Sequence, residues 1–161
     1  MKKVCAWLLF VAFVAAVGVV IRLRCDYKAP GHVVQGVVDG DTIKIRYGGV
    51  EESVRLLGVD TPETVHPDIP PEPFGAEATA FTKRLLQGEK VVLRFGRKQR
   101  DRYGRLLAFV YRTSDNQLVN LEIIRCGFGR VYGKDFPKRG QFIKAQREAQ
   151  AAKKGIWGSS D

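Results

Sequence analysis

The chain has 161 residues, which is enough for one domain with a sizeable hydrophobic core. Its net charge is +10, and residues 31–161 alone, with 22 basic and 16 acidic residues, carry +6, which favours a polyanionic partner, nucleic acid before an acidic membrane surface. Three cysteines without a Cys-x-x-Cys pair and only two histidines argue against a zinc site. A disulfide between Cys25 and Cys126 stays open, but we expect the fold to rely on its core.

The first 30 residues are predicted to be a targeting segment, which consists of an N-terminal hydrophobic helix and a short linker. An uncharged, apolar run from Val4 to Ile21 follows two lysines and precedes Arg22 and Arg24. The run is only just long enough to span a bilayer, and a small-x-small cleavage pattern lies inside it. A signal peptide and an uncleaved membrane anchor both stay open, with the anchor slightly favoured. We therefore expect an exported protein, either anchored in the membrane facing outside the cytoplasm or secreted or periplasmic.

Three short strands separated by tight turns follow this leader. The segments His32–Asp39 and Thr42–Tyr47 alternate apolar and polar residues, and Asp39-Gly40-Asp41 between them has turn chemistry. Gly48-Gly49 ends the second strand, and Glu52–Gly58 makes a third. This spacing predicts a meander.

The second half of the chain combines helices with two further strands. Residues 64–74 carry four prolines and are expected to form a loop. The patterns then predict a helix over Gly75–Gln87, strands over Val91–Phe95 and Leu106–Tyr111, helices over Leu118–Cys126 and Pro137–Lys154, and a return of Ile156-Trp157 onto the core. Five short antiparallel strands, one helix between the third and fourth, and two helices at the end indicate an α+β fold, a five-stranded barrel of the oligonucleotide-binding (OB) type with three helices.

Acidic residues occur where the predicted strands meet their turns. Asp41 begins the second strand and Asp60 ends the third, and both are rim positions that a barrel can bring together. Two carboxylates, with backbone carbonyls and waters, make a site for a hard cation. Glu63 lies three residues beyond Asp60, within reach of a water on that cation.

Two arginines accompany these acids. Arg55 lies at the start of the predicted third strand, and Arg105 follows a turn over Asp101–Gly104. Two guanidinium groups, a divalent cation and a carboxylate base are the parts that phosphodiester hydrolysis requires. Each motif alone also fits an ordinary turn or a solvated surface residue.

The chain resembles the thermonuclease (staphylococcal nuclease-like) family in four segments, which read V-V-D-G-D-T-I-K-I, R-L-L-G-V-D-T-P-E-T, F-G-A-E-A-T-A-F-T-K and D-R-Y-G-R-L-L-A. They stand in the family's order and spacing, and the resemblance runs from about Val33 to Trp157. It implies that residues 31–161 form an OB-fold nuclease domain with a calcium ion. It also implies cleavage of DNA and RNA with low sequence specificity, leaving 3′-phosphate products. We expect this domain to be a monomer.

The resemblance assigns the acidic residues to a metal site. Asp41 and Asp60 correspond to the calcium carboxylates, and the carbonyl of Thr61 to a third ligand. Glu63 corresponds to the carboxylate that acts as the base or orients the water. Asp39 corresponds to an aspartate close to the metal that does not bind it directly.

The resemblance assigns the basic and aromatic residues to the nucleic acid. Arg55 and Arg105 correspond to the clamps on the phosphate, and Arg102 and Tyr103 to residues near a phosphate of the nucleotide. The family pattern has two tyrosines that flank the bound base. Here the segment reads R-V-Y-G-K-D-F-P, in which only Tyr132 fits, so base stacking is expected to differ.

Two other functions stay open besides a metal-dependent endonuclease. One is a catalytically silent nucleic-acid-binding module of the same fold, and the other is a membrane-anchored adaptor whose nuclease domain is vestigial. The presence of all five site side chains favours the enzyme: Asp41, Arg55, Asp60, Glu63 and Arg105.

Overall fold

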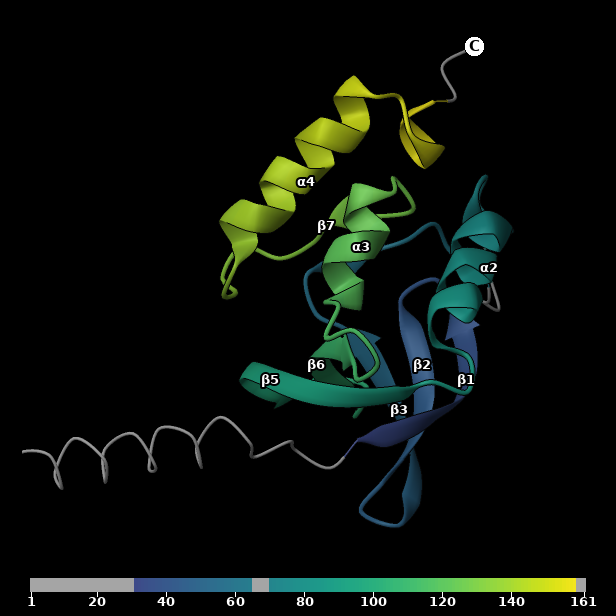
Figure 1. The fold of residues 1–161 in the computed structure, drawn as a ribbon, viewed down its shortest axis with the longest axis vertical. Coiled ribbons are helices and arrows are strands. Elements are labelled where there is room, and N and C mark those ends of the chain that lie inside the picture. Colours follow the sequence, from purple (N-terminus) through teal and green to yellow (C-terminus); the bar gives the residue numbers. More distant parts are fainter. Residues whose placement is uncertain (1–30, 65–69, 159–161) are drawn as a thin grey trace, which may run out of the picture. The chain divides into compact units, whose positions relative to one another are not determined.

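The structure is a computed structural model that describes residues 31–64 and 70–158, shown in Figure 1. Five of its strands close into a barrel in the order β1-β2-β3-β6-β5. The barrel strands are β1 (His32–Asp39), β2 (Thr42–Tyr47), β3 (Val50–Leu56), β5 (Lys90–Arg100) and β6 (Leu106–Arg112). The helices in the described residues are α2 (Gly75–Leu86), α3 (Val119–Arg125) and α4 (Arg139–Ala151). The predicted α+β fold with a five-stranded barrel and three helices is confirmed.

Two expectations fall on the remaining residues. The N-terminal hydrophobic helix and Cys25 of the Cys25–Cys126 pair both lie outside the described ranges. Among the described residues, none of the helices has the length and hydropathy needed to span a bilayer.

The third predicted strand differs from the observed one. β3 ends at Leu56, a bend follows at Leu57-Gly58, and the chain continues as the two-residue strand β4 (Val59–Asp60), which pairs with β7 (Arg130–Val131). Gly58 makes this bend with φ +83, and a Cβ atom there would lie 2.8 Å from the Phe136 ring. Arg55 therefore lies near the end of β3, and the prediction that it begins the strand is wrong.

The barrel is mixed, so the prediction of five antiparallel strands is wrong for one pair. β3 runs parallel to β6, with Val54 opposite Leu106 and Arg55 opposite Leu107. A parallel pair needs a long crossover, and the segment containing α2 and β5 supplies it. The seam between β1 and β5 is short, since only His32 and Val33 pair there, with Val91 and Lys90.

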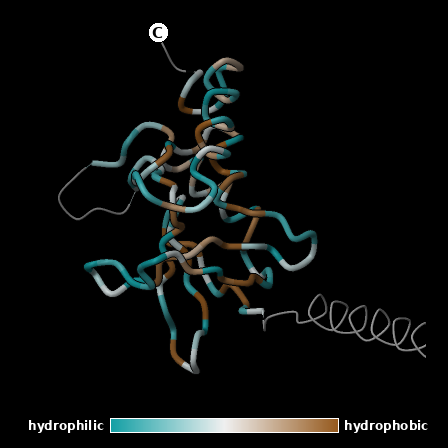
Figure 2. Tube along the Cα trace, turned by 90° about the vertical axis from the view of Figure 1, so that its left-hand side faces the viewer, coloured by the Kyte–Doolittle hydropathy of each residue, from teal (hydrophilic) through white to brown (hydrophobic). Residues whose placement is uncertain are grey.

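The helices pack on the barrel in a row with α3 between α2 and α4 (Figure 1). Buried residues from all parts of this assembly form the core, among them Ile43, Ile45, Leu56, Leu86, Val91, Leu106, Ile123, Ile124 and Phe142. The hydrophobic stretches accordingly gather in the middle of the trace in Figure 2, and most of the projecting loops are hydrophilic. α4 is shorter than the predicted helix over Pro137–Lys154, and Ala152 is exposed just beyond its end.

The C-terminal return forms the short helix η1 (Gly155–Trp157). The backbone N–H of Ile156 donates to the carbonyl of Gly127 at 2.9 Å, and the Arg130 guanidinium lies 5.5 Å from the Trp157 ring centre. Neither Ile156 nor Trp157 belongs to the fully buried core, so the return covers the core rather than completing it.

Two buried polar side chains tie the helices to the rim of the barrel. Thr82 on α2 donates its hydroxyl to the carbonyl of Gly40 at 2.6 Å, in the turn between β1 and β2. Asn120 on α3 accepts from the N–H of Val110 and donates to the carbonyls of Leu57 and Ala108 at 2.8, 2.9 and 3.1 Å. These bonds fix the D-G-D turn and the bend before β4.

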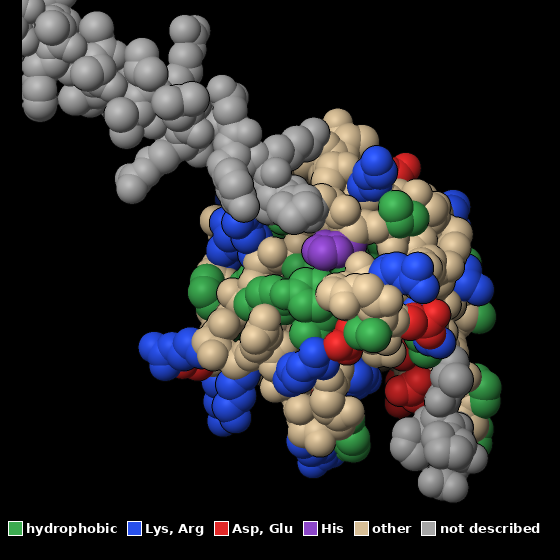
Figure 3. All heavy atoms as spheres, turned by 90° about the horizontal axis from the view of Figure 1, so that it is seen from below, with side chains coloured by type: hydrophobic (Ala, Val, Ile, Leu, Met, Phe, Trp, Pro, Cys, Tyr) green, Lys and Arg blue, Asp and Glu red, His purple; other side chains and the backbone are tan. Residues whose placement is uncertain are grey.

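The surface of the barrel carries many positive charges. Figure 3 shows Lys and Arg side chains spread around one face, with Asp and Glu side chains among them at one side. This distribution agrees with the positive net charge and suits a polyanion better than a single compact anion.

The clamp between α2 and the D-G-D turn can be tested by a nearly isosteric substitution. Thr82→Val leaves the Gly40 carbonyl buried without its partner, so the free energy of unfolding should fall by roughly 1–3 kcal/mol. Thr79→Val, one turn earlier on the same helix and only partly buried, should cost less than about 0.5 kcal/mol. Urea denaturation of both variants checks this, and equal losses would show that the Thr82 bond does not matter.

Candidate active site

The two acidic turns predicted to meet at the rim are in direct contact. Gly40 packs so closely on Thr61 that a Cβ atom at residue 40 would lie 2.6 Å from the Thr61 hydroxyl oxygen. The backbone N–H of Thr61 donates to Oδ2 of Asp41 at 2.9 Å. The N–H of Asp41 itself donates to Oδ1 of Asp39 at 3.0 Å. A glycine at residue 40 is therefore what allows Asp41 and the segment after Asp60 to touch.

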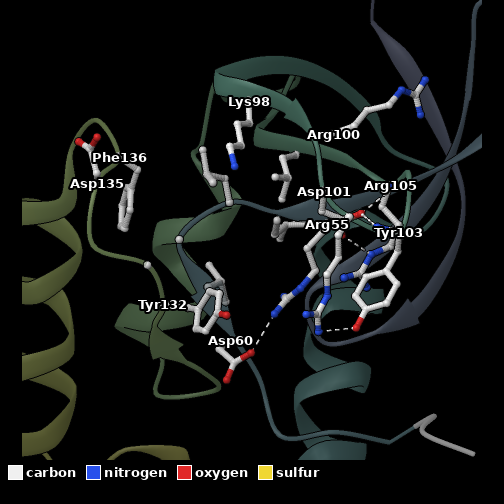
Figure 4. A pocket seen from close by; sticks show the side chains of 17 residues that line it. Arg55, Asp60, Lys98, Arg100, Asp101, Tyr103, Arg105, Tyr132, Asp135 and Phe136 are labelled. Carbon is white, nitrogen blue, oxygen red and sulfur yellow. Dashed lines mark hydrogen bonds and ion pairs between the residues drawn. The ribbon is translucent and has the colours of Figure 1, made fainter.

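Arg55 bridges the two predicted metal carboxylates. The register of β2 and β3 places it opposite Thr42, which is next to Asp41 in the chain. Its Nη1 pairs with Oδ2 of Asp41, and its Nη2 donates to Oδ1 of Asp60 at 2.8 Å, the contact drawn in Figure 4. The Arg55 side chain is only 15% exposed, so its charge acts in a largely dry setting.

Arg105 is held by the turn that precedes it. Asp101 accepts from the backbone N–H groups of Tyr103 and Arg105 at 2.9 and 3.0 Å, and from Nε of Arg105 at 2.7 Å. Partial burial acts to raise the pKa of Asp101, but the hydrogen bonds from Arg105 and the two N–H groups outweigh it and hold the pKa below its usual value. Asp101 thus stays ionised and fixes the orientation of Arg105.

A second ion pair supports the same turn from outside. Arg100 makes two hydrogen bonds to the carboxylate of Glu52 on β3, at 2.9 and 2.7 Å, and its Nη1 donates to the carbonyl of Gly104 at 2.6 Å. Bonds from Arg100 hold the pKa of Glu52 below its usual value. Because Gly104 directly precedes Arg105, this pair anchors the D-R-Y-G-R segment to β3.

A polar cavity of about 130 Å³, here called the acidic cavity, lies between these groups. It is lined by Asp39, Asp41, Arg55, Asp60, Thr61, Pro62, Glu63 and Arg105. The structure therefore brings the predicted acids and arginines together around one cavity at the rim of the barrel. The Glu63 carboxylate accepts a hydrogen bond from the N–H of Thr64 at 2.9 Å. The backbone N–H of Glu63 donates to the Glu72 carboxylate, and the backbone N–H of Glu72 donates to the Glu63 carbonyl.

The charges of the acidic cavity fit a divalent cation. Four carboxylates face two guanidinium groups, which leaves a formal charge of −2 when all are ionised. Burial raises the pKa of the Asp41 carboxyl to about 7, Arg55 acts to lower it, and Asp39 adds to the rise. A divalent cation beside this carboxylate, which is only 5% exposed and pairs with Arg55, would further favour its ionised form, and Asp60 with the Thr61 carbonyl could complete the protein ligands.

A larger cavity of about 640 Å³, here called the tyrosine cavity, adjoins the acidic one. Arg55, Asp60 and Arg105 line both cavities. The exposed rings of Tyr103 and Tyr132, 67% and 64% accessible, line the tyrosine cavity from different elements (Figure 4). The N–H of Tyr132 donates to the Gly58 carbonyl at 3.1 Å, which places this tyrosine beside β4.

The Tyr103 ring also stacks with arginines. The Arg102 guanidinium lies 4.7 Å from the ring centre and donates to the Tyr103 hydroxyl at 2.6 Å, and the Arg105 guanidinium lies 5.4 Å from the same centre. The three side chains form one cationic, aromatic surface.

Several residues near the site were not assigned a role from the sequence. Lys98, Arg100, Asp135 and Phe136 line the tyrosine cavity, and Asp101 and Glu52 orient the Arg105 segment. The sequence signal for Lys98, Arg100 and Asp101 was the charge density of K-Q-R-D-R-Y-G-R. Glu52, Asp135 and Phe136 lie outside this segment and reach the site through tertiary packing.

The sequence was compared with known proteins. The family described as "Staphylococcal nuclease homologue" matches residues 53–159. The thermonuclease of Staphylococcus hyicus is 41% identical over 123 residues, which cover 75% of this chain and 72% of that protein. The thermonuclease of Staphylococcus intermedius is 39% identical over 136 residues, 82% of this chain and 79% of that protein.

A Bacillus subtilis protein extends this set beyond the staphylococci. Endonuclease YncB of strain 168 is 39% identical over 127 residues, which cover 76% of this chain and 59% of that protein. The family match covers more than half of the chain, and both staphylococcal thermonucleases are about 40% identical over more than two thirds of their own length. The chain therefore belongs to the staphylococcal nuclease family.

Proposed function

We propose that the protein is a calcium-dependent nuclease that hydrolyses phosphodiester bonds of DNA and RNA with low sequence specificity and leaves 3′-phosphate products. The observation that carries this proposal is the acidic cavity, where four carboxylates and two guanidinium groups meet. The relatives named thermonuclease and endonuclease support phosphodiester cleavage as the reaction class.

Asp41, Asp60 and the Thr61 carbonyl are the residues that would hold the calcium ion. The bound ion supplies positive charge that stabilises the negative charge developing on the phosphate. Asp39 lines the same cavity and bonds to the Asp41 N–H, so its role is to position Asp41.

Arg55 and Arg105 bind the phosphate oxygens. A guanidinium matches two oxygens with two parallel hydrogen bonds, and such bonds to an anion are stronger than neutral ones. Asp101 uses Nε of Arg105, which leaves the terminal nitrogens of Arg105 for the substrate. Arg105 is thus held in place before the phosphate arrives, so little reorganisation of this charge is needed. Arg55 pairs with Asp41 and Asp60 through its terminal nitrogens, and a calcium ion on these carboxylates would free them for the phosphate.

Glu63 orients the attacking water or takes its proton. It lines the acidic cavity together with both arginines, which supports this role. Base catalysis by a positioned carboxylate is worth about 10²–10⁴-fold in rate.

The tyrosine cavity holds a nucleotide next to the reacting phosphate. Every base has a π-face, so stacking on Tyr103 or Tyr132 binds without strong sequence preference. Arg102 adds positive charge beside the Tyr103 ring. Low sequence specificity follows from this mode of binding.

A silent binding module of the same fold is the second candidate function. It would use the tyrosine cavity and the basic surface but would not need Glu63 in the acidic cavity. The intact set of acids and arginines favours the enzyme over this alternative and over a vestigial adaptor.

We also propose that residues 31–161 are the nuclease domain, which acts as a monomer, and that residues 1–30 direct the chain out of the cytoplasm. Barrel closure supports the boundary, because His32 and Val33 already pair with β5. The proposal covers both a cleaved signal and an anchor in the membrane, and the mass of the mature protein distinguishes the two.

Calcium binding can be measured without activity. The ion should raise the melting temperature of the full chain by several degrees, since a ligand at 100 times its dissociation constant stabilises by about 2.7 kcal/mol. Asp41→Asn and Asp60→Asn each remove one of the two carboxylate ligands and should lose most of this shift. Asp115→Asn, on an exposed loop where Asp115 pairs with Arg112, should keep it. A full shift in both site variants, measured by differential scanning fluorimetry against chelator, would refute the assignment.

Glu63→Gln should separate binding from chemistry. The amide keeps the size of the side chain but cannot take a proton, so single-turnover cleavage of single-stranded DNA at saturating calcium should slow by roughly 10²–10⁴-fold. Affinity for the oligonucleotide should change little. Glu77→Gln, an exposed acid in the first turn of α2, is the matched control and should cleave at the parental rate. Parental cleavage by Glu63→Gln would favour the binding module.

Arg55→Lys and Arg105→Lys keep the positive charge but cannot make two parallel hydrogen bonds to the phosphate. Each should reduce single-turnover cleavage far more than Arg46→Lys, which changes an exposed arginine on β2 outside the cavities. Circular dichroism excludes unfolding as the cause. Three equal rates would mean that neither site arginine contacts the phosphate.

A further inference from the structure

A third cavity of about 530 Å³, here called the outer cavity, adjoins the acidic cavity through a different set of residues. The tyrosine cavity shares Arg55 and Asp60 with the acidic cavity, whereas the outer cavity shares Asp39 and Glu63 with it. Arg105 lines all three cavities. The remaining wall of the outer cavity includes Thr42, Lys44 and Ser53 on the outward side of β2 and β3.

An enzyme that cuts within a strand must hold nucleotides on both sides of the reacting phosphate. The tyrosine cavity accounts for one side only. We propose that the outer cavity is a second nucleotide subsite, which takes the strand on the other side, and that Lys44 binds the next phosphate along it. This inference rests on the proposed nuclease function, and the volume lies within the range of ligand sites.

Lys44 is the side chain that suits this role. Of the residues that line the outer cavity, Lys44 and Arg105 are the basic ones, and the proposed function already assigns Arg105 to the reacting phosphate. Lys44 is 44% exposed, and its Nζ donates to Oε1 of Glu51 at 2.8 Å. An exposed pair of this kind contributes little to stability, so Lys44 can exchange Glu51 for a phosphate at small cost.

The chemistry of the outer cavity points to backbone rather than base recognition. Tyr103 is the one aromatic residue in its lining, and the tyrosine cavity shares that ring. The hydroxyls of Thr42 and Ser53 and the ammonium group of Lys44 can contact phosphate and sugar without reading sequence, whereas the carboxylates of Asp39 and Glu63 lie where this cavity adjoins the acidic one. Base stacking is thus confined to one side of the reacting phosphate.

Lys44→Gln should raise KM for a single-stranded octanucleotide several-fold with little change in kcat, because binding is lost equally from ground and transition state. The slope of log affinity against log salt should fall by about one, as for a lost phosphate contact. Arg46→Gln is the matched control, since Arg46 is the next outward residue of β2 and lines none of the three cavities. It should change neither quantity. Glu51→Gln frees Lys44 and should lower KM.

A short ligand tests the position of the contact. A dinucleoside monophosphate carries only the reacting phosphate, so its inhibition constant should be the same for Lys44→Gln and the parent protein, while that of an octanucleotide should rise. Equal effects of Lys44→Gln and Arg46→Gln, or equal losses for the short and long ligands, would overturn the subsite. If the parent protein does not cleave at all, the proposed function fails separately, and octanucleotide binding with calcium still tests Lys44.

Discussion

The parallel pairing of β3 with β6 is the constraint on which the rest of the structure depends. It closes the barrel between segments about fifty residues apart and puts Arg55 opposite Leu107. Arg105 stands just before β6, so the same register brings the second guanidinium to the rim where Arg55 meets the acids. The pairing that closes the barrel between β3 and β6 therefore also brings both guanidinium groups to the acidic cavity.

The position of Asp41 shows that the site is not arranged for stability alone. Its burial raises the pKa to about 7, so keeping the group ionised at neutral pH opposes folding. The ion pair with Arg55 offsets part of this cost, and removing one partner of such a pair would leave a buried charge uncompensated. The bond from Thr82 to the Gly40 carbonyl holds the turn that carries Asp41 in this unfavourable arrangement, and Asn120 holds the bend before β4.

Sequence reasoning found the local features and missed those set by long-range pairing. The D-G-D turn, the D-T-P-E turn and the D-R-Y-G-R segment carry their own turn chemistry, so their rim positions were predictable. The direction of β6 relative to β3 was not, because alternation of apolar residues is the same in parallel and antiparallel strands. The bend at Gly58 was also hidden, since it depends on Phe136 packing from a distant segment. The presence of Phe136 in the lining of the tyrosine cavity was hidden for the same reason.

In a chain synthesised from its N-terminus, the barrel cannot close at the seam between β1 and β5 until the second half of the chain is made. Until β5 and β6 have been synthesised, β1, β2 and β3 form a meander with two open edges. β5 covers the β1 edge and β6 covers the β3 edge, so a single late hairpin seals both. A nascent or truncated chain that ends before this hairpin has both acidic turns but lacks the second guanidinium. The order of synthesis thus delays completion of the acidic cavity until the barrel can close.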